Sequence, residues 1–319
     1  MLAQIVENYP EDVRHVFRHN PLIGTPDNPF HDKAAISAQA AEAAGEQGKF
    51  WEMHDLLFDL QDEWAGMSVE EFEVWVTDQA IELDLDEDQF VDDMKNEANA
   101  AAVQKAWDDN SAIGLTFTPL LLVNDEIWPN NLPMDYFSVS AVVELTMLEE
   151  RQFSECPPIT IDPLKQYVAV LHTSKGDISI ELFADQAPLA VNSFVFLAEE
   201  GWFDGVIFHR VLPGFVAQAG DPTGTGFGGP GYTFDNEIDP DLQFDKAGVV
   251  GMANAGPGSN GSQFFITYGP TPDLDGGYTI FGQVISGMDV ATSLTPRDPS
   301  SQGELPDGDV IESITIQRK

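Results

Sequence analysis

One stretch of the chain decides how its second half is read. It contains Phe208-His209-Arg210-Val211-Leu212-Pro213-Gly214-Phe215-Val216-Ala217-Gln218, then Met252-Ala253-Asn254-Ala255-Gly256, and then Gly261-Ser262-Gln263-Phe264-Phe265. A single basic side chain, Arg210, stands among alternating apolar residues in a region otherwise rich in aromatic, amide and glycine residues. This composition indicates a groove with few groups that take up or release a proton.

The residues around this stretch have the pattern of short β-strands. Tyr167–Leu171 and Asp177–Leu182 flank the turn Ser174-Lys175-Gly176, which predicts a hairpin. Short strands with Gly-rich turns follow as far as Ile316. Helices are predicted over residues 187–200 and 288–294. The spacing of the strands predicts an antiparallel barrel.

The first half of the chain is mostly helical in pattern. Apolar spacing predicts helices over residues 1–8, 33–44, 49–60, 87–110 and 134–150, and a capping box of Ser68 and Glu71 predicts another. Residues 13–18 alternate as a strand does. The segment 113–125 is predicted to be a loop, a turn at Thr118-Pro119 and a buried strand. Residues 151–166 are punctuated by prolines without either period, which predicts a linker.

The net charge argues against several classes of partner. The 319 residues include 14 basic and 54 acidic ones, a formal net charge of −40, and both halves of the chain are acidic. A surface of this sign repels phosphate backbones and anionic lipids, so neither nucleic acid nor a membrane surface is an expected partner. Solubility or a salty habitat explains the acidity, with binding of cations or basic polypeptides as the alternative. No apolar run is long enough to span a membrane, and the N-terminal residues lack the pattern of a signal peptide.

Two further features suggest a site but fail a closer test. The run Asp84-Leu85-Asp86-Glu87-Asp88 begins like an EF-hand loop, but Gln89 stands where that loop needs glycine, and Lys95 where it needs glutamate. We therefore predict an acidic helix N-terminus there, and no metal. Cys156 is the single cysteine. Without a nearby base or helix start to activate it, it is predicted to be an exposed spectator thiol and not a redox sensor.

Together, the motifs of the second half resemble the cyclophilins, a family of peptidyl-prolyl isomerases. The resemblance covers about Tyr167 to Arg318 and rests on Phe-His-Arg, Pro-Gly-Phe, a glutamine eight residues after the arginine, Met-Ala-Asn-Ala-Gly, Gly-Ser-Gln-Phe-Phe, Leu-Asp-Gly and Phe-Gly. It implies an all-β domain at 167–319, an eight-stranded antiparallel barrel with two capping helices. It also implies an enzyme without a cofactor or metal, which isomerises X-Pro bonds of proline-containing polypeptides during protein folding.

The resemblance also implies roles for individual residues. Arg210 would be catalytic, because its guanidinium never deprotonates and can donate a hydrogen bond where charge develops as the amide twists. Neighbouring His209 is predicted to be structural, since the reaction needs no proton transfer. Phe264 is predicted to point into the core, opposite to Phe265. The substrate-binding residues would be Phe215, Val216, Phe265 and Leu274 around the proline ring, Gln218 and Gln263 as positioning amides, Asn254 through its main chain, Ala253 and Ala255 as an open wall, and Tyr278 with its polar tip.

Three positions depart from the family pattern. Tyr278 replaces a frequent histidine, Asp273 replaces the tryptophan of the best-known members, and Val216 replaces a frequent methionine. By the same resemblance, loss of the indole at position 273 argues against tight cyclosporin binding but not against isomerisation. A chaperone module that binds proline peptides with little turnover is the alternative function. The sequence does not indicate an oligomeric state.

Residues 1–150 resemble the second part of a DsbA-like thioredoxin domain. The resemblance rests on Val16–Leu22, Ala40–Trp51 and Phe117-Thr118-Pro119, in which Pro119 would be the cis-proline of that family. A strand and a Cys-x-x-Cys helix start precede this part in the family, and the sequence contains neither, so thiol-disulfide exchange is not expected. Met1 would then be an internal methionine of a longer protein acting outside the cytoplasm. An incomplete domain of this kind is expected to be less stable than its length suggests.

Overall fold

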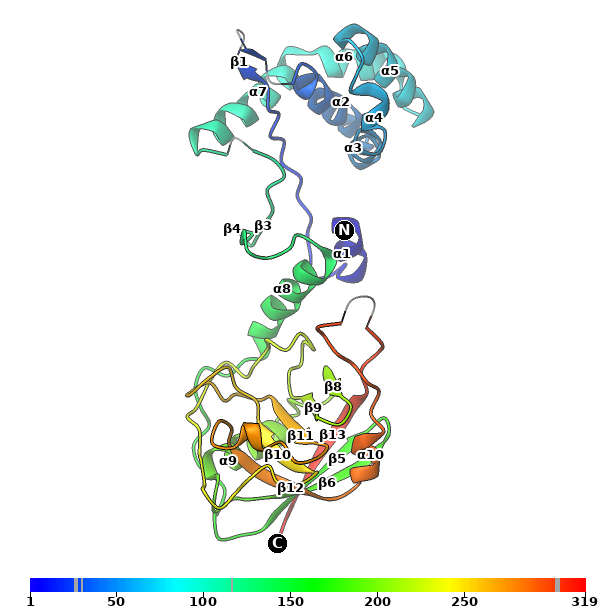
Figure 1. Ribbon diagram of the computed structural model, residues 1–319. Helices are drawn as coiled ribbons and strands as arrows, with labels where there is room; N and C mark the ends of the chain where they lie inside the picture. Colours follow the sequence, from blue (N-terminus) through cyan, green and yellow to red (C-terminus); the bar gives the residue numbers. More distant parts are fainter. Residues whose placement is uncertain (26–27, 30, 116, 302–304) are drawn as a thin grey trace. The chain divides into compact units, whose positions relative to one another are not determined.

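The computed structural model describes residues 1–25, 28–29, 31–115, 117–301 and 305–319, and these form two compact units (Figure 1). One unit joins Met1–Val13 to Met134–Lys319, and the other is Arg14–Pro133. Each unit has its own hydrophobic core, so each can be described by itself. No helix within the described ranges has both the length and the apolar character needed to cross a bilayer.

Two helices from the first half of the sequence belong to the unit that contains the barrel. Helix α1 (Leu2–Asn8) contacts helix α8 (Tyr136–Leu148), and the Tyr9 hydroxyl donates to Glu144 Oε1 at 2.8 Å. At its other end, α8 places Leu148 in the barrel core, and the short 3-10 helix η1 (Glu149–Arg151) follows. The compact units therefore differ from the predicted division at residue 150, because both ends of the predicted first domain group with the barrel.

Within the described residues, nine strands of this unit form one antiparallel sheet in the order β7-β13-β5-β6-β12-β10-β11-β9-β8. The two edge strands, β7 and β8, are separated in the chain by Phe208 and His209 alone, so the chain itself joins the edges and closes the curled sheet. If β7 and β8 are counted as one interrupted strand, the sheet has eight strands, which confirms the predicted barrel. The strands are β5 (Tyr167–Thr173), β6 (Gly176–Leu182), β7 (Val206–Ile207), β8 (Arg210–Leu212), β9 (Val216–Ala219), β10 (Val249–Met252), β11 (Phe264–Thr267), β12 (Ile280–Ser286) and β13 (Val310–Arg318).

The helices α9 (Pro188–Glu199) and α10 (Met288–Thr292) confirm the two that were predicted here. Pro188 begins α9, where a residue without an N–H costs nothing because the first turn has no acceptor for it. The apolar side of α9 covers the barrel, and the Phe194 ring lies 5.4 Å from the Phe264 ring in an edge-on arrangement. Burying such aromatic side chains contributes about 1.5–3 kcal/mol each and holds the helix on the sheet.

The predicted linker, residues 151–166, lies along the barrel. The Phe153 N–H donates to the Pro230 carbonyl at 2.9 Å, and the Thr160 N–H donates to Asn192 Oδ1 at 2.8 Å. Ile161 is buried in the barrel core. The Cys156 thiol is exposed, as predicted, and partial burial of its sulfur raises its pKa, which disfavours the reactive thiolate.

The second compact unit is a helical cluster in which α2 is central. Its core combines small side chains of α2, such as Ala40 and Ala44, with the large side chains Phe72, Phe90 and Met53. Small residues let α3, α6 and α7 approach α2 closely. Two short hairpins, β1 (Gly24–Thr25) with β2 (Asn28–Pro29) and β3 (Leu122–Val123) with β4 (Glu126–Ile127), complete it. The helices are α2 (Ala34–Glu46), α3 (Phe50–Asp59), α4 (Gln61–Trp64), α5 (Val69–Glu82), α6 (Glu87–Lys95) and α7 (Glu97–Ala112).

Several predictions for this unit are confirmed and three are wrong. The Ser68–Glu71 capping box begins α5, Asp86 caps an acidic first turn of α6, and the Thr118-Pro119 bond is cis. The helix predicted over 87–110 is instead two helices, because the Asn96 side chain accepts from the Asn99 N–H at 2.7 Å and starts α7. Residues 13–18 form no strand. The predicted buried strand is the two-residue β3, in which Leu122 is 46% exposed.

Candidate active site

Three neighbouring strands of the barrel bring the predicted catalytic residue beside its predicted partners. β8 pairs with β9 so that Arg210 lies opposite Gln218, and β9 pairs with β11 so that Gln218 lies opposite Phe265. Directly opposed residues of antiparallel strands project from the same face of the sheet. Val216, two residues before Gln218, shares that face. The strand register therefore aligns a cation, an amide and an aromatic ring.

The guanidinium of Arg210 is held on two sides. Its Nη1 donates to Gln218 Oε1 at 3.3 Å, and its Cζ lies 5.7 Å from the centroid of the Phe215 ring, within the range of a cation–π contact. In the part of the chain that the structure describes, no carboxylate forms an ion pair with Arg210. A guanidinium has five N–H donors, so this arrangement leaves several of them for a bound carbonyl.

Two glutamine amides link Arg210 to a neighbouring loop. Gln218 Nε2 donates to Gln263 Oε1 at 3.0 Å, and Gln263 Nε2 donates to the carbonyls of Gly226 and Gly228 at 2.9 and 3.0 Å. Each amide has its NH₂ toward an acceptor and its oxygen toward a donor. Gln218 therefore presents an oxygen, not an NH₂, to the guanidinium.

An apolar cluster lies beside these polar residues. Phe265 is 4% exposed, and its ring lies 5.5 Å from the Tyr278 ring in an edge-on arrangement. Val216 and Phe265 belong to the buried part of the cluster, and Phe215, Ala253, Leu274 and Tyr278 pack against it half-buried. The structure thus brings the four residues predicted to surround a proline ring together with two other predicted binding residues, Ala253 and Tyr278. Asp273, the position of the missing indole, lies exposed in the 3-10 helix η2 (Pro272–Leu274) beside the cluster.

The cluster also contains residues that the sequence did not single out. Phe244 is fully buried and stacks on Phe265 at 5.5 Å, and Gly251 lies beneath both rings. A Cβ on Gly251 would lie 2.7 Å from Phe265 Cζ and 3.0 Å from Phe244 Cζ, so only glycine leaves these rings in place. Phe244 stands in an irregular acidic loop, and its one sequence signal is an aromatic residue among polar ones.

The predicted main-chain binding residue, Asn254, uses its side chain within the protein. Its Nδ2 donates to the Gly277 carbonyl at 3.2 Å, and its Oδ1 accepts from the Gly256 N–H at 3.1 Å. Among the described residues, the Asn254 N–H and carbonyl form no hydrogen bond within the protein. Ala255 is fixed beside it, since its N–H donates to Ser259 Oγ at 2.9 Å. The loop thus offers main-chain groups next to the apolar cluster.

Two neighbours of the site residues lie in the interior. Phe264 is fully buried against Phe194 and Phe203, on the opposite side of β11 from Phe265, which confirms its predicted core position. His209 is 2% exposed, and neither ring nitrogen has a hydrogen-bond partner among the residues described. Burial is the main cause that lowers its pKa to about 4; Asp221 opposes this shift, and Arg297 and Arg210 add to it. The imidazole is therefore neutral at pH 7.

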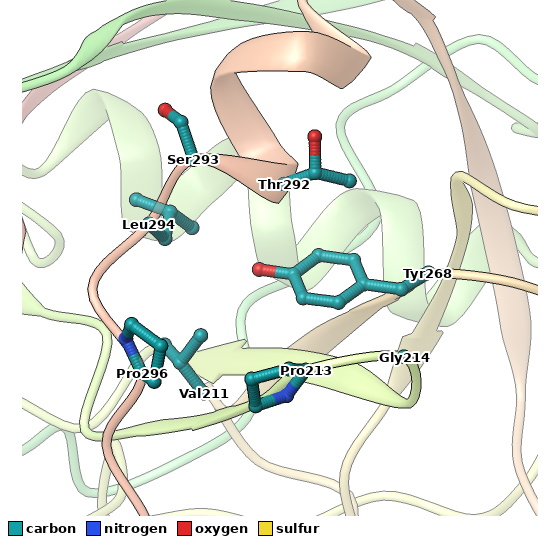
Figure 2. Close-up of a pocket in the computed structure, with 8 residues that line it drawn as sticks. All are labelled: Val211, Pro213, Gly214, Tyr268, Thr292, Ser293, Leu294 and Pro296. Atoms are coloured by element: carbon teal, nitrogen blue, oxygen red, sulfur yellow. The ribbon is translucent and has the colours of Figure 1, made fainter.

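A separate hollow of about 420 Å³ lies beside Pro213 and Gly214 of the turn between β8 and β9 (Figure 2). It is lined by Val211, Pro213, Gly214, Tyr268, Thr292, Ser293, Leu294 and Pro296, and thus by none of the predicted site residues. The Tyr268 hydroxyl donates to the Ala291 carbonyl at 2.6 Å, and burial raises its pKa to about 12. The residues described as lining it include neither a cation nor a cluster of aromatic rings, so this hollow lacks the features of the Arg210 site.

Known proteins resemble both halves of the chain. Residues 167–317 match the family model described as cyclophilin type peptidyl-prolyl cis-trans isomerase/CLD, and residues 3–143 match a model described as thioredoxin. The peptidyl-prolyl cis-trans isomerase A of Mycobacterium tuberculosis is 47% identical over 180 residues, which cover 51% of this chain and 99% of the relative. An isomerase of Schizosaccharomyces pombe is 51% identical over 150 residues, covering 46% and 97%. A crystal structure of a cyclophilin type isomerase from Cryptosporidium parvum, 40% identical, covers 48% of this chain and 98% of its own, with a TM-score of 0.44.

Proposed function

Because the chain belongs to the cyclophilin family of peptidyl-prolyl cis-trans isomerases, we propose that the groove around Arg210 and Phe265 is the place where it isomerises X-Pro bonds. The activity acts on proline-containing polypeptides. The observation that carries the proposal is the meeting of Arg210, Gln218 and the Phe265 cluster on one face of the barrel. The second half of the chain supplies all of these residues.

The reaction requires a site that favours a twisted amide. Rotation about a peptide bond faces a barrier of about 18–20 kcal/mol, because resonance gives the C–N bond double-bond character. The two isomers of an X-Pro bond lie within about 1 kcal/mol of each other, so an enzyme needs to raise only the rate at which they interconvert. As the amide twists, the proline nitrogen regains its lone pair and the carbonyl oxygen moves. A positively charged donor held at the new position of these groups lowers the barrier without proton transfer.

Arg210 meets these requirements. The Phe215 ring and Gln218 fix its guanidinium, so little reorganisation is needed as the amide twists. Because an arginine cannot lose its proton in a protein, the donor stays charged at every working pH. Within the described ranges the buried, neutral His209 has no hydrogen-bond partner, which supports a structural role and not that of a base. We assign Arg210 as the catalytic residue.

The apolar cluster would receive the proline ring. A proline has no N–H, so its ring can enter an apolar pocket without leaving a donor unpaired. Phe215, Val216, Phe265 and Leu274 would surround the ring, Ala253 would leave room beside it, and Tyr278 would close one edge. Asn254 would bind the peptide main chain through its own N–H and carbonyl, next to Ala255. Gln263 would fix Gln218 in the orientation that serves Arg210.

A matched pair of variants tests this site. The proline protons of a short Xaa-Pro-Phe peptide should shift upfield on binding, since aromatic rings surround them. Phe265→Leu should remove most of this shift and weaken binding about fivefold, consistent with loss of an aromatic contact worth roughly 1 kcal/mol. Phe264→Leu, the neighbour that faces the core, should keep both shift and affinity while lowering the Tm. Equal effects of the two changes on peptide binding would disprove the assignment of the pocket. A peptide that binds here without faster isomer exchange would favour the binding-module alternative.

A further inference from the structure

A buried carboxylate lies behind the amide chain that ends at Arg210. Asp221 is fully buried two residues after the end of β9, and it accepts hydrogen bonds from three main-chain N–H groups, those of Thr223 at 2.8 Å, Gly226 at 2.7 Å and Gly228 at 3.0 Å. The Thr223 hydroxyl donates to it at 2.7 Å. One side chain thus fixes the course of the loop from residue 221 to residue 228. Such charge-assisted hydrogen bonds are about twice as strong as neutral ones.

The same two glycines that Asp221 holds also hold Gln263. Gly226 and Gly228 each turn an N–H toward the carboxylate and a carbonyl toward Gln263 Nε2. Gly226 has a φ of 85°, which favours glycine, and a Cβ on Gly228 would overlap Asp221 Oδ1. The loop therefore carries two fixed carbonyls, and their positions depend on the carboxylate.

The two carbonyls determine how every amide in the chain is turned. Because a carbonyl can only accept, Gln263 must turn its NH₂ toward them and its oxygen toward Gln218. Gln218 must then turn its NH₂ toward Gln263 and its oxygen toward Arg210 Nη1. If Gln263 were free to flip, Gln218 could flip with it and present an NH₂ to the guanidinium. We propose that Asp221 is a positioning residue of the isomerase, which orients Arg210 through the 221–228 loop, Gln263 and Gln218. This inference rests on the proposed catalytic role of Arg210.

Asp221→Asn is the direct test. Both carboxylate oxygens accept main-chain N–H groups, so whichever way the new amide turns, its NH₂ faces a donor. The loop should loosen, and kcat for an Xaa-Pro-Phe peptide should fall about tenfold to a hundredfold, the size of effect expected when a catalytic group is misplaced by about 1 Å. The Kd for the peptide should change little, because the apolar pocket is intact. Asp309→Asn is the matched control. Asp309 is a nearly buried carboxylate of the same barrel that accepts from the Thr295 N–H at 2.6 Å, away from the amide chain, and its loss should leave kcat unchanged.

A double-mutant cycle separates positioning from general stability. If Asp221 acts through Gln263, then Asp221→Asn should reduce kcat little further in a Gln263→Ala background. Losses that multiply, or a fall in Tm with kcat unchanged in the folded protein, would overturn the proposal. Thr223→Val, which removes the hydroxyl that donates to Asp221, serves if Asp221→Asn does not fold. It should lower kcat about twofold to fivefold by the same coupling, and an unchanged kcat would again refute it.

A comparison with the variant Arg210→Ala separates this proposal from the proposed function. If Arg210→Ala isomerises the peptide as fast as the wild type, the catalytic assignment fails, and the positioning role fails with it. If Arg210→Ala is slow while Asp221→Asn keeps the wild-type kcat, only the positioning role is lost. The two proposals can therefore fail separately.

Discussion

The buried His209 predicts that acid destabilises the barrel in a defined pH range. The ordinary pKa of histidine is 6.5, and burial beside Arg297 and Arg210 lowers that of His209 to about 4. Between these two values the unfolded chain binds the proton and the folded chain does not, so the free energy of unfolding falls as the pH falls. The full difference of pKa corresponds to about 3 kcal/mol, at 1.36 kcal/mol for each pH unit. Between about pH 7.5 and pH 5 the loss is about 2 kcal/mol.

The comparison of wild type with His209→Phe isolates this contribution. Phenylalanine has a ring of similar size and does not titrate, so the variant should lose about 2 kcal/mol less than the wild type over this pH range. Urea unfolding followed by pulse proteolysis, with the protected barrel fragment as the signal, measures the barrel alone. The other acidic and histidine side chains contribute equally to both proteins and cancel in the difference. The reasoning is refuted if the two proteins lose the same free energy between pH 7.5 and pH 5.

Three further predictions test the groove and the segment that lies along the barrel. Gly251→Ala places a methyl group against Phe265 and Phe244, so it should lower the free energy of unfolding in urea by about 1–3 kcal/mol. It should also weaken the binding of a proline peptide in a titration. Wild-type affinity would show that the two rings do not form the pocket. Ile161→Ala should lower the free energy of unfolding of the barrel by about 2–5 kcal/mol, although residue 161 lies outside every strand. Substitution of the exposed Leu164 by alanine should have almost no effect. Equal small effects of the two changes in urea unfolding would show that this segment does not pack on the barrel. Asp273→Trp should strengthen cyclosporin binding at least tenfold in calorimetry by restoring an indole at the edge of the groove, and an unchanged Kd would exclude position 273 as the cause of weak binding.

The resemblance named the groove residues, and the structure brings them together because most of them lie on or beside a few regular strands. In β8, β9 and β11 the side chains alternate, so the spacing of Arg210, Gln218 and Phe265 determined which faces they share once the register paired them. The opposite facing of Phe264 followed from the same alternation. The antiparallel barrel followed from the spacing of the strands, and its eight strands from the resemblance. Neither indicated the interruption of one strand at Phe208 and His209.

What the sequence did not predict depends on contacts that have no local period. Phe244 joins the groove from an irregular loop, where no spacing marks a buried residue. Asn96 ends one helix and caps the next because its side chain competes for a main-chain N–H, while the apolar pattern continues across it. Residues 13–18 alternate as a strand does, but no described neighbour pairs with them. The Asp221 hydrogen bonds likewise became visible only when the 221–228 loop was seen to turn back on its own first residue.

The most direct test of the account compares isomerisation by the wild type with that by Arg210→Ala. Each protein would be present far below the concentration of an Xaa-Pro-Phe peptide, and exchange between the cis and trans proline signals would be followed by NMR. Arg318→Ala, which removes an exposed arginine paired with Glu199, is the matched control. The account predicts that Arg210→Ala loses about a hundredfold to a thousandfold in kcat, with peptide Kd changed only a few-fold and the Arg318→Ala rate unchanged. Wild-type kcat in Arg210→Ala, or a wild type that binds the peptide without accelerating exchange, would contradict it.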